Sequence, residues 1–190
     1  ARFPVPVIVH VAGTSPDEAA ACCRRLASVE AVAGIEIGLP DTADPDDIVA
    51  IIQAARAAVS QPLIGKLPLT GACSPHSLYS LCEAAVEADV DALTVAAPPR
   101  GTVWHEPSGR FVTGRFYGPS VHPLALCALR RVAELVSVPL IGCGGIHSVE
   151  DGLAFLRAGA TAIQVGGALW RDPACLTHIA GGLSPTVASL

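Results

Sequence analysis

The chain has 190 residues, of which 51% are hydrophobic and only 15% are charged, and its formal net charge is -5 at pH 7. This length suits one domain with a sizeable core. The negative charge, the 4% aromatic content and the absence of a Lys/Arg cluster argue against nucleic acid as a partner. No apolar run approaches the roughly 18 residues that a membrane-spanning helix needs, so we expect a globular protein without a membrane segment.

Seven cysteines are present, but none forms a C-x-x-C pair and no histidine lies at metal-finger spacing from them. We therefore expect no metal. An odd number of cysteines indicates reduced thiols and a cytoplasmic location. The chain contains no methionine and opens on a strand-like run, so we expect that it does not begin at its natural start.

Short apolar runs alternate with segments of helical periodicity along the chain. The predicted strands are residues 6–12, 35–39, 63–67, 92–97, 138–142 and 162–166, and the predicted helices are residues 16–27, 45–59, 74–88, 123–135 and 148–158. Most spacings are close to the length of one βα unit, which predicts a parallel sheet with right-handed crossovers.

A closed eight-stranded barrel typically needs about 250 residues. Six predicted units are two short of eight, so we expect a TIM-type (β/α) barrel, as one partial domain over residues 1–190, that is either open or incomplete or has its first two βα units absent from this chain.

Residues typical of helix starts and ends lie at the boundaries of several predicted helices. Ser15 and Asp44 each precede a proline and acidic residues, which is typical of a capped helix start. Ser148 followed by Asp151 has the spacing of a capping box, and Gly159 fits the end of the same helix. Residues 98–118 show little helical period, so we expect an irregular active-site loop there. His105 and Glu106 in this loop are either an acid–base pair or ordinary surface residues.

Two predicted strands in succession end in glycine pairs. Gly144 and Gly145 follow one strand, and Gly166 and Gly167 follow the next. Backbone without side chains lets N–H groups approach an anion, and a following helix N-terminus adds partial positive charge. A single pair is more often a tight turn, but pairs on consecutive strands favour a phosphate site, and we expect the phosphate to belong to a cofactor.

Several motifs resemble the dihydroorotate dehydrogenase family of FMN-dependent β/α barrels. They are VIVHVAG at 7–13, GKLP at 65–68, GRFYGPSVHP at 114–123, IGCGGIHSVED at 141–151 and GATAIQVGGA at 159–168. The resemblance covers nearly the whole chain and corresponds to the third to eighth strands of the family barrel. It implies an oxidoreductase of pyrimidine biosynthesis that oxidises a dihydropyrimidine by hydride transfer to FMN.

The resemblance also implies roles for individual residues. Lys66 matches the lysine that reaches the N1/O2 edge of the flavin ring, where an ammonium would stabilise the negative charge of the reduced form; the alternative is a lysine that snorkels to solvent. The matches for cofactor binding are Lys66, Gly118, Gly144, Gly145, Gly166 and Gly167. The implied partners are a small-molecule substrate, a separate electron-acceptor subunit and a second copy in a homodimer.

The chain departs from the family where the catalytic base should lie. The family has a cysteine or serine in a loop after the strand that matches residues 34–40, and this chain has neither at residues 38–42. Gly38 replaces an asparagine, and a second substrate-binding amide is missing from residues 94–98. Asp41 is the nearest substitute for the base, although a cap or loop role is more common for such a residue. We therefore expect flavin reduction by dihydroorotate to be slow or absent.

Two further functions stay open. A divergent barrel would bind FMN or another phosphate ligand without this chemistry, and an isomerase or lyase would use the glycine pairs for a phosphorylated metabolite, with Lys66 available for a Schiff base. Cys143 is expected to be a small filler rather than a nucleophile. His122 and His147 either touch the cofactor edge or cap a helix.

Overall fold

The computed structural model describes residues 5–69 and 77–187. Its centre is a parallel sheet of six strands in the order β1-β2-β3-β4-β7-β8. These strands are β1 (Val7–Ala12), β2 (Val32–Gly38), β3 (Leu63–Pro68), β4 (Ala92–Ala97), β7 (Leu140–Cys143) and β8 (Ala162–Gln164). Each strand pairs in parallel with the next, so all their carboxyl ends meet at one edge.

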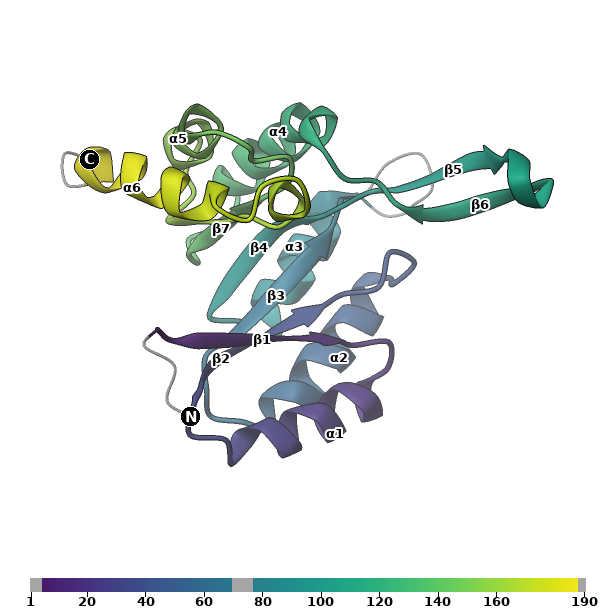
Figure 1. Cartoon of the computed structure of the whole chain (residues 1–190). Coiled ribbons are helices and arrows are strands. Elements are labelled where there is room, and N and C mark those ends of the chain that lie inside the picture. The colour runs from purple at the N-terminus through teal and green to yellow at the C-terminus, as the bar shows by residue number, and fades with distance from the viewer. Residues whose placement is uncertain (1–4, 70–76, 188–190) are drawn as a thin grey trace.

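Five helices fill the connections between successive parallel strands, and a sixth follows β8. They are α1 (Pro16–Ala27), α2 (Pro45–Arg56), α3 (Leu78–Glu87), α4 (His122–Ala133), α5 (Val149–Arg157) and α6 (Cys175–Val187). The sheet curls between the helices like part of a barrel wall (Figure 1). In the described part of the chain it stays open, because β1 and β8 have a strand neighbour on one side only.

The core lies between the outer face of the sheet and its helices. Ile35 and Leu63 on the strands and Ile48 on α2 have no exposed surface. Burying an aliphatic side chain of this size contributes about 1.5–3 kcal/mol, so this apolar layer holds the strands in register. The edge strand β1 is less covered, and its Ile8 is 53% exposed.

The predicted helix caps are confirmed. The Ser15 side chain accepts a hydrogen bond from the Glu18 N–H, and Asp44 and Ser148 form capping boxes with Asp47 and Asp151. Such caps satisfy N–H groups that a helix leaves without an internal partner. The caps fix where the helices begin at the carboxyl ends of β1, β2 and β7, and therefore shape the loops of this edge.

The prediction of an irregular loop at residues 98–118 is wrong. It contains an antiparallel hairpin of β5 (Arg100–His105) and β6 (Arg110–Arg115), joined by a short 3-10 helix, η1 (Glu106–Ser108). Cross-strand pairs stabilise the hairpin, including an edge-to-face contact of Trp104 with Phe111 at 5.1 Å between ring centroids. The hairpin extends away from the sheet (Figure 1), and the side chains of both strands are exposed.

The α/β fold with six parallel strands is confirmed at every predicted strand. The predicted helices are also found, although residues 74–76 of one of them lie outside the described residues. Helix α6 was not predicted. The described strands form an open curled sheet, and the expectation of a TIM-type barrel whose first two βα units are absent from this chain stays a prediction.

Candidate functional site

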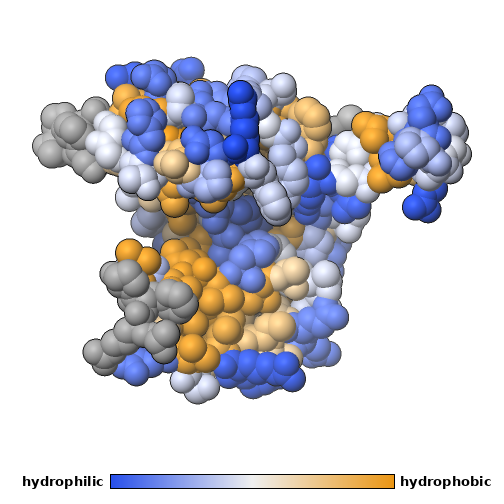
Figure 2. Space-filling view, in the orientation of Figure 1, coloured by the Kyte–Doolittle hydropathy of each residue, from blue (hydrophilic) through white to orange (hydrophobic). Residues whose placement is uncertain are grey.

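A cavity of about 680 Å³ opens at the carboxyl ends of the strands. Its volume falls within the range of about 300–1,000 Å³ that is typical of small-molecule sites. Every predicted site residue lines it, namely Asp41, Lys66, Gly118, Gly144, Gly145, Gly166 and Gly167. Figure 2 shows a hydrophilic recess above the apolar surface of the lower half of this face. The sheet therefore brings together residues that lie up to 126 positions apart, from Asp41 to Gly167.

The two glycine pairs lie side by side because β7 and β8 are neighbours, with Cys143 opposite Gln164. Gly144 and Gly145 have φ angles of +128° and +67°, which side chains disfavour. A Cβ on Gly145 would lie 2.4 Å from the His122 backbone nitrogen, so this glycine permits close packing within the protein. A Cβ on Gly166 would meet no atom within 4 Å, so the space beside Gly166 is open.

Helix α5 contributes fewer free N–H groups to an anion than its position suggests. Oδ2 of Asp151 accepts hydrogen bonds from the backbone N–H groups of His147 at 2.9 Å and Ser148 at 3.0 Å. A carboxylate of the chain itself therefore occupies this helix start. The glycine backbone is what remains available to a phosphate at this side of the cavity.

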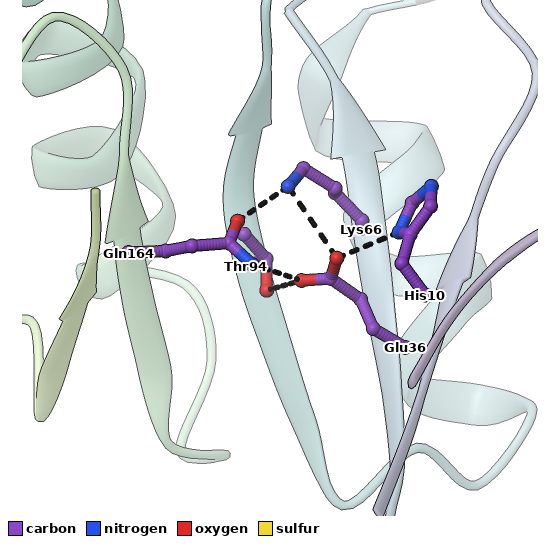
Figure 3. Close-up of polar contacts among 5 residues, drawn as sticks. All are labelled: His10, Glu36, Lys66, Thr94 and Gln164. Carbon is purple, nitrogen blue, oxygen red and sulfur yellow. Dashed lines mark hydrogen bonds and ion pairs between the residues drawn. The ribbon is translucent and has the colours of Figure 1, made fainter. Parts of the chain in front are cut away.

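A polar cluster of five side chains has Glu36 at its centre (Figure 3), and four of the five line the same cavity as the glycine pairs. Oε2 of Glu36 lies 2.7 Å from Nδ1 of His10 and 3.4 Å from Nζ of Lys66. Oε1 accepts hydrogen bonds from Oγ1 of Thr94 at 2.6 Å and from Nε2 of Gln164 at 3.4 Å. Lys66 also donates to Oε1 of Gln164, which closes the network between β3 and β8.

Glu36 is ionised in this cluster. The residue is 2% exposed, and burial raises the pKa of its carboxyl group. The hydrogen bond from His10, the charge of Lys66 and the hydrogen bond from Thr94 outweigh burial and lower that pKa to about 2. A buried carboxylate with these partners fixes the positions of the groups around it.

Sequence reasoning found Lys66 in this cluster and missed its partners. With the structure known, the pattern can be recognised in the sequence. Five apolar strands each carry one polar side chain on the pocket side, and the pairing of neighbouring strands aligns these side chains. His10 lies opposite Glu36 in the β1–β2 register, and Lys66 lies opposite Thr94 in the β3–β4 register. The Lys66 side chain is only 12% exposed, so the alternative of a snorkelling lysine is wrong.

Asp41 lies at the rim of the cavity, after β2. One of its carboxylate oxygens is 2.7 Å from Nη1 of Arg115, and the other is 3.6 Å from Nη1 of Arg100. Arg115 also donates to the Pro98 carbonyl oxygen at 2.8 Å. Asp41 therefore joins the end of β2 to the base of the hairpin.

The remaining candidates divide between the cavity and its surroundings. Cys143 lines the cavity, and burial raises the pKa of its thiol although the charge of Lys66 acts in the opposite direction. His147 also lines it, with Nδ1 2.9 Å from the Gly145 carbonyl oxygen. His105 bonds to Ser108 at 2.7 Å near the hairpin tip, where it forms no pair with Glu106 among the contacts of the described residues.

The part of the chain that the structure describes contains no group of three His, Cys, Asp or Glu side chains placed to hold a metal ion. Six of the seven cysteines are free, and Cys73 lies outside the described residues. None of the described helices combines the length and apolar character needed to cross a membrane.

Fold and site together define a β/α protein with a ligand pocket at the carboxyl ends of its parallel strands. The chain belongs to the dihydroorotate dehydrogenase family, whose family model matches residues 1–187. The resemblance inferred from the motifs is therefore confirmed.

Curated relatives agree with this assignment. The chain is 35% identical over 199 residues to the "Dihydroorotate dehydrogenase B (NAD(+)), catalytic subunit" of Trichlorobacter lovleyi, covering 96% of this chain and 64% of the relative. It is 36% identical over 191 residues to the protein of the same description from Geobacter metallireducens. That match covers 92% of this chain and 61% of the relative. The chain thus spans about 64% of the length of the first of these relatives.

A solved structure supports the fold. The chain matches the crystal structure of DHODH in complex with ferulenol from Eimeria tenella with a TM-score of 0.70 and 18% sequence identity. The match covers 92% of this chain and 54% of the other. At this identity the likeness concerns the fold alone.

Proposed function

We propose that the cavity binds FMN and that the protein oxidises a dihydropyrimidine, as an oxidoreductase of the dihydroorotate dehydrogenase type. The observation that carries the proposal is a buried ammonium, Lys66, held between Glu36 and Gln164 beside two glycine pairs in one cavity. An apolar sheet accommodates such a charge only with partners, and here the partners hold it at the cavity wall.

The residues of the cavity fit the cofactor. A Cβ built on Gly118 or on Gly166 would have no other heavy atom within 4 Å. The backbone therefore faces open space at both positions. The phosphate would be held by backbone N–H groups of Gly144, Gly145, Gly166 and Gly167. FMN, when bound, supplies two-electron acceptance at its ring system.

The protein's own residues would orient the bound cofactor and stabilise its reduced form. Lys66 places a positive charge where the ring edge becomes negative on reduction, and Glu36 keeps that ammonium in position through their 3.4 Å contact. Gln164 supplies an amide on the pocket side of β8, in a site where the sequence had suggested that such groups were lost. Asp41, the candidate proton acceptor from the sequence, lies on the cavity wall with two guanidinium partners.

A separate electron acceptor is part of the proposal. The relatives' printed description names a catalytic subunit of an NAD(+) enzyme, which implies a further subunit in those proteins. We propose that a partner of this kind reoxidises the flavin here, and that the catalytic protein forms a homodimer.

The test is a visible spectrum of the purified protein with FMN, recorded before and after anaerobic addition of dihydroorotate. The missing family base and amides predict slow or absent reduction, whereas the proposal expects a yellow protein whose absorption in the blue is bleached. Bound flavin without bleaching would favour the divergent, non-catalytic barrel. Protein that binds inorganic phosphate but no flavin would favour the isomerase or lyase, although a Schiff base in that function would need a free lysine amine and Nζ of Lys66 has two partners.

A further inference from the structure

His10 is a pocket residue within the motif at 7–13, but neither that motif nor the family assignment gives it a role. It is the fourth residue of β1, opposite Glu36 in the register, and it lines the cavity. Its side chain is 50% exposed, whereas that of Glu36 is 3% exposed. The imidazole therefore stands between a buried carboxylate and the open cavity (Figure 3).

Gly38 provides the space for this ring. A Cβ built on Gly38 would lie 2.7 Å from Cε1 and 2.8 Å from Nε2 of His10. Real Cβ atoms do not approach other atoms so closely, so a side chain at position 38 would displace the imidazole from its present place. Gly38, which replaces an asparagine of the family, is thus the residue that lets His10 reach the cavity.

Glu36 orients the imidazole. An ionised carboxylate only accepts hydrogen bonds, so the 2.7 Å contact requires a proton on Nδ1 of His10. In the neutral ring the lone pair is then on Nε2, the nitrogen nearest to the space beside Gly38. A buried carboxylate behind a histidine also stabilises the imidazolium that forms when Nε2 takes a proton.

We propose that His10 is the proton acceptor of this site, with Glu36 as its positioning residue. The inference rests on the proposed function. Nε2 of His10 would take the proton from the ring carbon next to a carbonyl of the dihydropyrimidine, and bound FMN would supply the acceptor for the hydride of the neighbouring carbon. The electron pair of the broken C–H bond at the first carbon would form the C=C bond as the hydride leaves the second, the imidazole would become imidazolium, and its proton would pass to solvent in the open cavity.

Two other cavity groups compete for this role, and their contacts favour His10. Both carboxylate oxygens of Asp41 face guanidinium groups, from Arg115 and Arg100. His147 follows the Gly144-Gly145 pair and is bonded to the Gly145 carbonyl oxygen, so it lies on the phosphate side of the cavity. Within the described residues, the one hydrogen bond of the His10 ring is the bond to Glu36, which leaves Nε2 for a ligand.

The kinetic test compares flavin bleaching by dihydroorotate in an anaerobic stopped-flow instrument for the FMN-loaded wild type and three variants. Asn retains an amide that can donate to Glu36 but has no proton-accepting nitrogen, so His10→Asn should slow bleaching by about 10²–10⁴-fold. FMN affinity should stay at the wild-type value. Asp41→Asn and His147→Asn should each slow bleaching far less than His10→Asn.

The outcomes separate this inference from the proposed function. Wild type that binds flavin and is not bleached would contradict the proposed function, and His10 would then have no such proton to accept. Wild type and His10→Asn bleached at equal rates would overturn only the role of His10. A greater loss in Asp41→Asn than in His10→Asn would assign the proton to Asp41.

A second measurement needs neither flavin nor turnover. Nitrogen NMR of the ¹⁵N-histidine-labelled chain reports which ring nitrogen of each histidine carries the proton, and His10→Asn identifies the signal of His10. We expect the neutral ring to carry its proton on Nδ1 and not on Nε2, and we expect Glu36→Gln to change this distribution. His178→Asn, an exposed position on α6, should leave the His10 signal in place. A neutral ring protonated on Nε2 would overturn the proposal.

Discussion

Nζ of Lys66 lies 3.4 Å from Oε2 of Glu36, and both side chains are almost completely buried. The pair crosses from β3 to β2 at the wall of the cavity, so the positive charge that would face a flavin is held by a charge inside the sheet. Removing one member of a buried pair leaves the other charge without compensation. The stability of the sheet and the arrangement of the site therefore depend on the same contact.

Glu36→Gln should lower the free energy of unfolding by about 3 kcal/mol, the order of loss seen when one partner of a buried pair is removed. The amide keeps the size of the side chain and loses the charge opposite Lys66 and His10. Chemical denaturation measures the loss, and Glu87→Gln on the exposed face of α3 should stay within about 0.5 kcal/mol of wild type. Equal stability of the two variants would contradict the role given to Glu36.

The dependence of stability on pH should report the same carboxylate. Its pKa is about 2 in the folded protein against an ordinary value of 4.5, so the unfolded chain binds a proton first as the pH falls. The stabilisation by Glu36 is therefore complete above about pH 4.5 and is lost progressively as the pH falls toward about 2. The unfolding free energy of Glu36→Gln should vary less with pH across this window than that of wild type or Glu87→Gln.

Much of the fold was predictable because the signals are local. An apolar run of five or six residues, a cap and a proline lie within a few positions of one another, and each strand–helix unit repeats them. The hairpin at β5 and β6 lacks an apolar face toward the core, so its alternating residues were not recognised as strands. Helix α6 contains Gly181, Gly182 and Pro185, which are poor helix formers.

A site residue was predictable from the sequence only where its residue type is unusual in its local context. Glycine pairs and a lysine inside an apolar strand are unusual by themselves, and the structure places all of them on the cavity. His10, Glu36 and Gln164 gain meaning only from the register that aligns β1 with β2 and from the curl that brings β8 toward β3. Their hydrogen bonds join positions 26 and 98 residues apart, which no local pattern reveals.

Thiol labelling tests the burial of the cysteines and the filler role of Cys143. Cys22 and Cys127 are exposed, whereas Cys82 and Cys143 are buried and burial raises the pKa of both thiols, that of Cys82 to about 11. Because the thiolate is the reactive form, maleimide at neutral pH should modify Cys22 and Cys127 before Cys82 and Cys143. Mass spectrometry of the digested protein locates the label. Early labelling of Cys143 would show a reactive thiol at the cavity and contradict the filler role.

Flavin binding through the glycine backbone is the central claim, and Gly166 is the position that tests it cleanly. A Cβ at this position meets no protein atom within 4 Å and faces the cavity that Gly166 lines. A Cβ at Gly145, in contrast, would collide with the backbone of His122. Gly166→Val should therefore fold with wild-type stability and leave no room for the phosphate. Gly114→Val on the exposed strand β6 is the matched control, because that glycine also has no neighbour within 4 Å and lies outside the cavity.

The decisive measurement is an FMN titration of wild type, Gly166→Val and Gly114→Val, followed by quenching of flavin fluorescence, with thermal unfolding recorded for each protein. We expect saturable binding by wild type and Gly114→Val, and loss of binding by a stably folded Gly166→Val. Absence of FMN binding by folded wild type, or undiminished binding by Gly166→Val, would contradict the assignment of this cavity.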